Sequence, residues 1–438
     1  MKYIVKNKNK EIVHTAQSTR RLPLFWLVSL VCIAIGVVTT PYLSTVALLL
    51  FGISLVLFRQ EEVLAFLIGL LPFANVFKLS TSSMSLFTVC EIAAVACLLF
   101  RNRLKVSQLF VPAALAAYLF AFSFGNLNAL LIIKIIAGFL LIVLAVSTFT
   151  NEWLKPSARM LSFSTIAMLL LSSNNTYFVH VQKYFLDLDY YIDPTILMAT
   201  DTLRMSGFFG DPNYCAILIL LVLSLLCVLY YYKAMGAEFW LHAAFLVPLG
   251  FFTYSKSYFL CIVILAVMLI VFVLFPKHKF WAFVALVGIG VAAYLITNGK
   301  IEVINMILVR FKQGDLTTGR AKLNQIYLQY IYENPKVMLF GEGISADRFL
   351  GAGNNVHCLY IELIYKLGIV GTLLYCGTLA AMLSQKRQKT ERHFINYLPL
   401  TFFLVLFSFL AGLANYAFPF YIILVFLSFN YTRLDSEK

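Results

Sequence analysis

A histidine at the head of an apolar run is the first candidate for chemistry in this sequence. His357 follows the stretch GAGNN at 351–355 and opens an apolar run over 357–383. An imidazole with an ordinary pKa of about 6.5 can take a proton from a hydroxyl group near neutral pH, as a general base does. The alternative interpretation is a histidine that only anchors the start of a helix.

Three cations form a second candidate group. Arg204 and Arg320 both lie close to glycines, in RMSGFFGDPN and TTGR, and Lys256 lies in the short polar stretch TYSKSY. The planar fork of an arginine side chain binds phosphate oxygens in a bidentate fashion, so two such groups brought together could hold a diphosphate. The alternative is that these cations only anchor segments at an interface.

Other polar residues are candidates for supporting roles. Asn213 stands at the start of an apolar run, where its side chain is expected to cap a helix. Glu362 precedes Lys366 by four residues, the spacing and order of a helical ion pair, so a structural pair is the favoured interpretation. Two further candidates lie in the polar stretch before the histidine: Arg348 and Asn355.

The elements that must position these residues are membrane spans. Hydrophobic residues make up 61% of the 438 residues, only 12% are charged, and the mean hydropathy is +0.86. Soluble domains have about a quarter of their residues charged, so this composition excludes a soluble protein. Apolar stretches of about 17 to 25 residues predict an all-α polytopic membrane bundle of about 12–14 transmembrane helices.

The predicted spans follow one another along most of the chain. They cover 22–40, 42–58, 63–77, 84–100, 109–125, 129–149, 158–173, 213–232, 239–254, 257–275, 280–297, 357–383, 395–412 and 416–431. The pairs 22–58 and 239–275 have only short interruptions, so each pair is also compatible with a merged, broken or re-entrant span.

The distribution of lysine and arginine predicts the orientation. If the basic N-terminal tail is cytosolic, most of these residues fall on the inner side and the short outer turns are almost free of them, as the positive-inside rule requires. Both termini are therefore predicted to be cytosolic. The formal charge of +14 reflects this topology rather than a nucleic-acid partner.

The chain divides into tails, helices and one long outer loop. The segments 174–212 and 298–356 are both too long to be simple connectors. Within the second, GRAKLNQIYLQYIYENP predicts a helix along the membrane surface that ends before Pro335. The predicted organisation is a cytosolic tail at 1–21, transmembrane helices at 22–297 with an outer segment at 174–212, a large extracytoplasmic loop at 298–356, C-terminal transmembrane helices at 357–431, and a cytosolic tail at 432–438.

The sequence contains no signature of a cofactor. None of the eight cysteines belongs to a CxxC pair, which argues against a disulfide framework and a zinc site. A Walker loop and a Rossmann fingerprint are also missing. We therefore expect neither a cofactor nor a metal.

Taken in order, the motifs resemble those of the O-antigen polymerase and ligase superfamily, the Wzy and WaaL group of bacterial surface-polysaccharide enzymes. The resemblance covers roughly 200–375. Two departures are Cys358, where the family usually has asparagine after the histidine, and Lys256, where relatives tend to have arginine. The matching pieces are Arg204–Gly207, Asp211-Pro212-Asn213, Ser255-Lys256, Gly319-Arg320, Pro335, Gly341-Glu342-Gly343, His357, Glu362, Gly368 and Gly371.

The resemblance implies a GT-C-like, metal-independent glycosyltransferase in the bacterial cytoplasmic (inner) membrane, with an active site that faces outward. It would use an undecaprenyl-diphosphate-linked oligosaccharide as donor and a sugar hydroxyl as acceptor. His357 would activate the acceptor, and the diphosphate would be held by Arg204, Lys256 and Arg320.

The favoured function is a polymerase of O-antigen, capsule or exopolysaccharide repeat units. The alternatives are an O-antigen ligase-type transferase and, from a different class, a flippase for lipid-linked oligosaccharides. The expected partners are the lipid-linked substrate, the bilayer, and a chain-length regulator and a flippase of the same pathway, with no nucleic acid.

Overall fold

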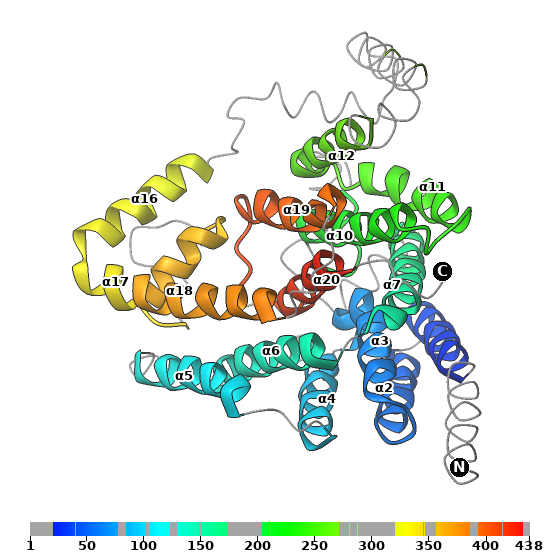
Figure 1. The fold of residues 1–438 in the computed structure, drawn as a ribbon, viewed down its shortest axis with the longest axis horizontal. Helices are drawn as coiled ribbons and strands as arrows, with labels where there is room; N and C mark the ends of the chain where they lie inside the picture. Colours follow the sequence, from blue (N-terminus) through cyan, green and yellow to red (C-terminus); the bar gives the residue numbers. More distant parts are fainter. Residues whose placement is uncertain are drawn as a thin grey trace, which may run out of the picture. The chain divides into compact units, whose positions relative to one another are not determined.

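The structure is a computed structural model. It describes residues 21–39, 41–77, 85–101, 106–122, 129–148, 150–173, 204–209, 211–270, 280, 287, 320–344, 346, 356–385, 393–413 and 415–431. The regular secondary structure of these residues is helical, with no strand among them (Figure 1). This confirms the predicted all-α fold class.

Five of the described helices are long and apolar enough to cross a membrane. They are Arg21–Val38, Gln60–Phe77, Leu130–Thr148, Pro212–Tyr231 and Leu359–Ala380. Shorter apolar helices, which coincide with other predicted spans, are Tyr42–Leu57, Pro112–Phe122, Glu238–Phe251, Lys256–Leu269, Phe394–Phe407 and Phe418–Asn430. The predicted span 280–297 lies almost entirely outside the described residues. These helices are those of an integral membrane protein.

The chain forms two compact units. The first unit comprises residues 1–103, 147–203 and 207–210, and the second comprises residues 104–146, 204–206 and 211–438. All the candidate site residues within the described ranges belong to the second unit.

In the first unit, α3 is the most deeply buried helix. It runs over Gln60–Leu70, continues as the 3-10 helix η1 over Leu71–Phe77, and packs along α7. Besides the helix Arg21–Val38, the other elements that the structure describes in this unit are α2 (Pro41–Leu57), α4 (Leu86–Arg101) and α7 (Asn151–Ser172).

The helix that contains the predicted span 158–173 begins seven residues before it, because α7 starts at Asn151. The segment 151–157 is polar and includes Pro156, so it resembles a loop by hydropathy. Helical backbone hydrogen bonds do not require apolar side chains, and the helix continues through the proline.

In the second unit, α10 (Pro212–Tyr231) is the central helix. Its residues from Cys215 to Leu229 are all buried, and it packs against α11 (Glu238–Phe251), α12 (Lys256–Leu269), α19 (Leu398–Phe407) and α20 (Phe418–Asn430). The remaining elements among the described residues of the unit are α5 (Val106–Phe122), α6 (Ala129–Thr148, whose last two residues belong to the first unit), α16 (Arg320–Glu333), α17 (Pro335–Phe340), α18 (Leu359–Gln385) and the 3-10 helix η5 (Phe394–Tyr397).

Two predicted pairs of neighbouring spans are resolved as separate helices. The helix Arg21–Val38 ends before α2 begins at Pro41. A turn over residues 252–255 separates α11 from α12, and Tyr254 in this turn has a φ of 46°.

The predicted span 357–383 corresponds to α18, which is interrupted at one residue. Gly368 interrupts α18 with a φ of 65° and a ψ of 179°, far from helical values. The short helix α17 packs against α18, and both lie beside α16 in Figure 1. The helix predicted within residues 319–335 is confirmed as α16, Arg320–Glu333, while its placement along a membrane surface stays a prediction.

Candidate functional site

The turn between α11 and α12 holds the segment that carries Arg204. The Nε of Arg204 donates a hydrogen bond to the carbonyl oxygen of Thr253 at 3.0 Å, and the N–H of Met205 donates to the carbonyl oxygen of Phe252 at 2.9 Å. The same turn leads directly into Lys256, the first residue of α12. Two of the three predicted cations therefore belong to one small piece of structure.

The start of α10 is hydrogen-bonded to this turn. The Oγ of Ser255 caps α12 by accepting from the N–H of Tyr258 at 3.4 Å, and it also donates to the Oδ1 of Asn213 at 3.0 Å. Asn213 is buried, so this contact is shielded from water. The contact joins the Asp-Pro-Asn motif to the turn that carries Arg204 and Lys256.

The residue that caps α10 is Asp211, so the prediction that Asn213 caps this helix is wrong. The Oδ1 of Asp211 accepts from the N–H of Asn213 at 2.7 Å and from its Nδ2 at 2.9 Å. Asp211 has the extended backbone of a cap, with φ −119° and ψ 123°, and Pro212 occupies the first helical position that proline favours. Asn213 is the second helical residue, two positions past the cap.

His357 lies just before α18, half-buried, in the electric field of several charged groups. Burial, and next the positive charge of Arg320, lower the pKa of His357 below its ordinary 6.5, while the negative charges of Asp211 and Glu362 act in the opposite direction. The imidazole is therefore neutral at pH 7 and can accept a proton. These interactions place the histidine, Arg320 and the cap of α10 in one electrostatic environment.

A shared apolar core holds α16 against the first half of α18. Tyr327 and Ile331 of α16 are buried with Val356, Ile361 and Tyr365 from the segment around His357. The rings of Tyr327 and Tyr365 meet edge to face, with their centroids 5.0 Å apart. Because α16 begins at Arg320, this core fixes the helix of the arginine relative to the segment of the histidine.

Glu362 and Lys366 form the predicted ion pair, with 3.3 Å between Oε1 and Nζ. The other carboxylate oxygen, Oε2, accepts from the N–H of Gly412 at 2.7 Å and from the N–H of Leu413 at 3.1 Å. Glu362 is 4% exposed and Lys366 is 8% exposed, so both charges are buried. The pair thus also anchors the linker between α19 and α20.

This linker and Tyr214 are parts of the site that the sequence did not point to. The Oη of Tyr214 donates to the carbonyl oxygen of Ala411, and Tyr214 lies within the electrostatic range of Glu362, Asp211 and Arg320. Nothing in the stretch LAGLANYAFP marks it as a neighbour of α10 and α18. By contrast, the Asp-Pro-Asn motif was visible, and Asp211 could have been named from it.

Two predicted supporting residues, Arg348 and Asn355, lie outside the described residues. Of the remaining candidates, Arg204 and Asn213 bond to the turn that leads into Lys256, while the charges of Arg320 and Glu362 both act on His357, just before α18. Asp211 connects the two groups, since it binds Asn213 directly and its charge acts on His357. Within the ranges that the structure describes, no three His, Cys, Asp or Glu side chains cluster as metal ligands would.

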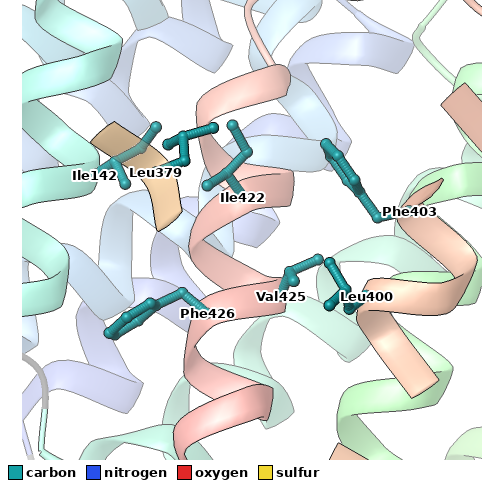
Figure 2. A pocket seen from close by; sticks show the side chains of 7 residues that line it. All are labelled: Ile142, Leu379, Leu400, Phe403, Ile422, Val425 and Phe426. Carbon is teal, nitrogen blue, oxygen red and sulfur yellow. The ribbon is translucent and has the colours of Figure 1, made fainter. Parts of the chain in front are cut away.

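A small apolar cavity of about 80 Å³ lies among α6, the second half of α18, α19 and α20. Figure 2 shows its lining side chains, which are aliphatic or aromatic throughout: Ile142, Leu379, Leu400, Phe403, Ile422, Val425 and Phe426. The cavity is therefore suited to a hydrocarbon rather than to a polar ligand.

The helices and the site together define an integral membrane protein with a polar, charged site in its second unit. Residues 241–376 match the family model described as O-antigen ligase, which supports the O-antigen polymerase and ligase superfamily, whose members are glycosyltransferase-like enzymes. The matched range covers about a third of the chain and includes Lys256, Arg320, His357 and Glu362. No curated protein and no solved structure matches the chain.

Proposed function

We propose that the chain polymerises undecaprenyl-diphosphate-linked oligosaccharide repeat units. It would transfer the glycan from the lipid diphosphate to a sugar hydroxyl on the outer side of the cytoplasmic membrane. The observation that carries this proposal is a histidine kept neutral partly by Arg320, in a segment that matches the O-antigen ligase family.

The chemistry requires a base and a site for a leaving diphosphate. The acceptor hydroxyl attacks the anomeric carbon of the donor sugar, its proton passes to His357, and the bond to the diphosphate oxygen breaks with its electron pair on that oxygen. Arg204, Lys256 and Arg320 would stabilise the negative charge that develops there. A neutral imidazole near a cation suits both tasks, accepting the proton and stabilising the diphosphate. The same arginine that holds the diphosphate would also keep the base unprotonated.

The supporting residues have different contributions in this proposal. Asn213 links the cap of α10 to the turn of Arg204 and Lys256, and Glu362 holds the linker at Gly412. Arg348 and Asn355, close in sequence to His357, are proposed to contact the substrate near the histidine. These roles do not involve a cofactor or a metal.

The lipid part of the donor needs an apolar environment. The cavity between α18, α19 and α20 offers one to a segment of the polyprenyl chain (Figure 2). The donor stays in the bilayer, so the protein needs no separate pocket for a soluble nucleotide sugar. The bilayer is therefore a partner in substrate delivery, and a flippase and a chain-length regulator of the same pathway are the proposed protein partners.

A second candidate function is that of an O-antigen ligase, because the matched family model carries that description. Both reactions share the donor, the base and the leaving group, and they differ in the acceptor. A flippase is the candidate from another class, since it too has many spans and intramembrane charges. It has no need of a base at the acceptor side.

The test uses purified protein in detergent with lipid-linked repeat units, a chelator and no nucleotide sugar. A polymerase lengthens the glycan and releases undecaprenyl diphosphate, whereas a ligase transfers only to a separate acceptor. A flippase has no second compartment in detergent and produces neither product. A folded preparation that makes neither product, both alone and with a separate acceptor added, refutes the transferase proposal and favours the transporter.

The role of His357 is tested in the same assay. His357→Ala should lower transfer by about 10² to 10⁴, the usual effect of losing a general base. His393→Ala is the matched control, because His393 is exposed and lies beside Tyr231 at the other end of α10. Equal activity of the two variants would remove His357 from the mechanism.

A further inference from the structure

The break in α18 frees backbone carbonyl groups that an unbroken helix would satisfy. In a continuous helix, the carbonyl oxygens of Tyr365 and Lys366 would accept from the N–H groups four residues later. Here the N–H of Glu342 donates to the Tyr365 oxygen at 2.8 Å, and the N–H of Gly343 donates to the Lys366 oxygen at 3.1 Å. The segment that follows α17 thus replaces part of the helical hydrogen bonding of α18.

A hydroxyl group from α5 replaces the next helical hydrogen bond. The Oη of Tyr118 donates to the carbonyl oxygen of Leu367 at 2.6 Å and accepts a hydrogen bond from the backbone of Gly371. In a continuous helix, Gly371 and Leu367 would bond to each other directly. The same hydroxyl lies 3.1 Å from the carbonyl oxygen of Phe340 at the end of α17. One phenol therefore bridges the two sides of the break.

Three glycines allow these segments to approach. A Cβ atom on Gly341 would lie 2.3 Å from the Lys366 oxygen, and one on Gly368 would lie 2.3 Å from the Leu339 oxygen. Both residues have positive φ values, 79° and 65°, that favour glycine. A Cβ on Gly371 would lie 2.5 Å from Cε1 of Tyr118. We name the assembly of Tyr118 with residues 340–343 and 365–371 the latch.

The latch joins the two segments that carry the proposed base and one proposed phosphate ligand. Arg320 begins α16, which leads through α17 into residues 340–343, while His357 precedes the half of α18 that ends at the latch. The apolar core that contains Tyr327 and Tyr365 lies between the latch and the segments that carry Arg320 and His357. The first half of α18 is thus held to α16 by the apolar core and to the segment after α17 by the latch.

We infer that Tyr118 is a positioning residue for the transfer reaction. Its hydroxyl holds the latch closed and so fixes the position of Arg320 relative to His357, without touching the substrate. This inference rests on the proposed function for its effect on catalysis, whereas the latch itself can be measured without any activity. It also explains why the Gly-Glu-Gly motif and the glycines of α18 stand where they do.

The first measurement is hydrogen exchange of the whole protein in detergent. Tyr118→Phe removes only the hydroxyl, so amide exchange in residues 340–343 and 365–371 should become faster. Tyr232→Phe is the matched control, since its hydroxyl bonds to Oδ1 of Asn396 at 2.7 Å, away from the latch. Exchange that is the same in Tyr118→Phe and the wild type would overturn the latch.

The second measurement separates binding from turnover. Small displacements of catalytic groups cost up to about a hundredfold in rate, so Tyr118→Phe should lower kcat roughly ten- to a hundredfold with little change in the KM for the lipid-linked donor. Adding Tyr118→Phe to His357→Ala should cause no comparable further loss, because both changes act on the same base. Tyr232→Phe should retain the wild-type kcat.

A second pair of variants tests the same assembly without altering the tyrosine. Gly371→Ala pushes against the Tyr118 ring, whereas Gly377→Ala on the same helix meets nothing within 4 Å. The first should reproduce the loss in kcat and the faster exchange, and the second should change neither. Faster exchange with an unaltered kcat in both latch variants would overturn the positioning role. Wild-type protein that shows no transfer would overturn the proposed function instead, and the exchange data would still decide the latch.

Discussion

Replacing Glu362 by glutamine should destabilise the protein more than removing its ionic partner does. Glutamine keeps the shape of the side chain and one acceptor oxygen, but it removes the negative charge. In the native structure that charge faces the Nζ of Lys366 at 3.3 Å and two backbone N–H groups, those of Gly412 at 2.7 Å and Leu413 at 3.1 Å. Glu362→Gln therefore weakens three contacts at once and leaves a buried ammonium group without its carboxylate.

The magnitude follows from the burial of both charges. Breaking a buried ion pair by removing one partner costs about 3–5 kcal/mol, so Glu362→Gln should lie in that range. In Lys366→Met the carboxylate keeps its hydrogen bonds to Gly412 and Leu413, each worth about 1.5–3 kcal/mol. That variant should therefore lose less. The double variant removes both charges and should be more stable than Glu362→Gln alone.

The assay is thermal unfolding of the purified protein in detergent, followed by tryptophan fluorescence, for the wild type, both single variants and the double variant. The expected order of unfolding temperature is wild type, then Lys366→Met, with Glu362→Gln lowest and the double variant above it. Additive losses, or a larger loss for Lys366→Met than for Glu362→Gln, would refute the assignment of Glu362 as the anchor of the linker.

Two further predictions concern pH and topology. Burial and the charge of Arg320 lower the pKa of His357, so kcat/KM for transfer should rise with pH through a midpoint below 6.5 and stay level above it. Arg320→Gln removes the positive charge and should move this midpoint upward. An unchanged midpoint would show that Arg320 does not act on the pKa of His357. In a variant without the eight native cysteines, a cysteine introduced at Gln325 should be labelled from outside intact cells, and one at Gln388 only after permeabilisation. Reversed labelling would overturn the predicted orientation.

The helices were largely predictable because their apolar residues occur in continuous runs. The span 213–232 corresponds to α10 at Pro212–Tyr231, and the helix stretch after Gly319 corresponds to α16. The start of α7 was not predictable by the same rule, since residues 151–157 are polar while their backbone is helical. Hydropathy measures the preference of side chains for lipid, and helix ends depend on backbone bonding and caps.

The features that sequence reasoning missed depend on partners far away along the chain. Gly368 can break α18 because Tyr118, 249 positions from Leu367, satisfies a freed carbonyl. Likewise, Glu362 has the spacing of an ion pair with Lys366, but its second role depends on backbone groups at Gly412, 50 positions away. The spacing of nearby residues contains no information about such distant partners. It could therefore identify the ion pair of Glu362 and Lys366 but not the hydrogen bonds of Glu362 to the linker at Gly412.

The break in α18 limits how this protein can be dissected or recombined. The matched range 241–376 contains the broken helix, His357 and Arg320, yet the hydroxyl that bridges the break comes from α5, outside that range. A fragment or chimera that begins after residue 128 would have to leave the Leu367 carbonyl unsatisfied in an apolar environment, or straighten the helix. A transplantable module must therefore bring Tyr118 with it, although the boundaries of sequence similarity exclude that residue.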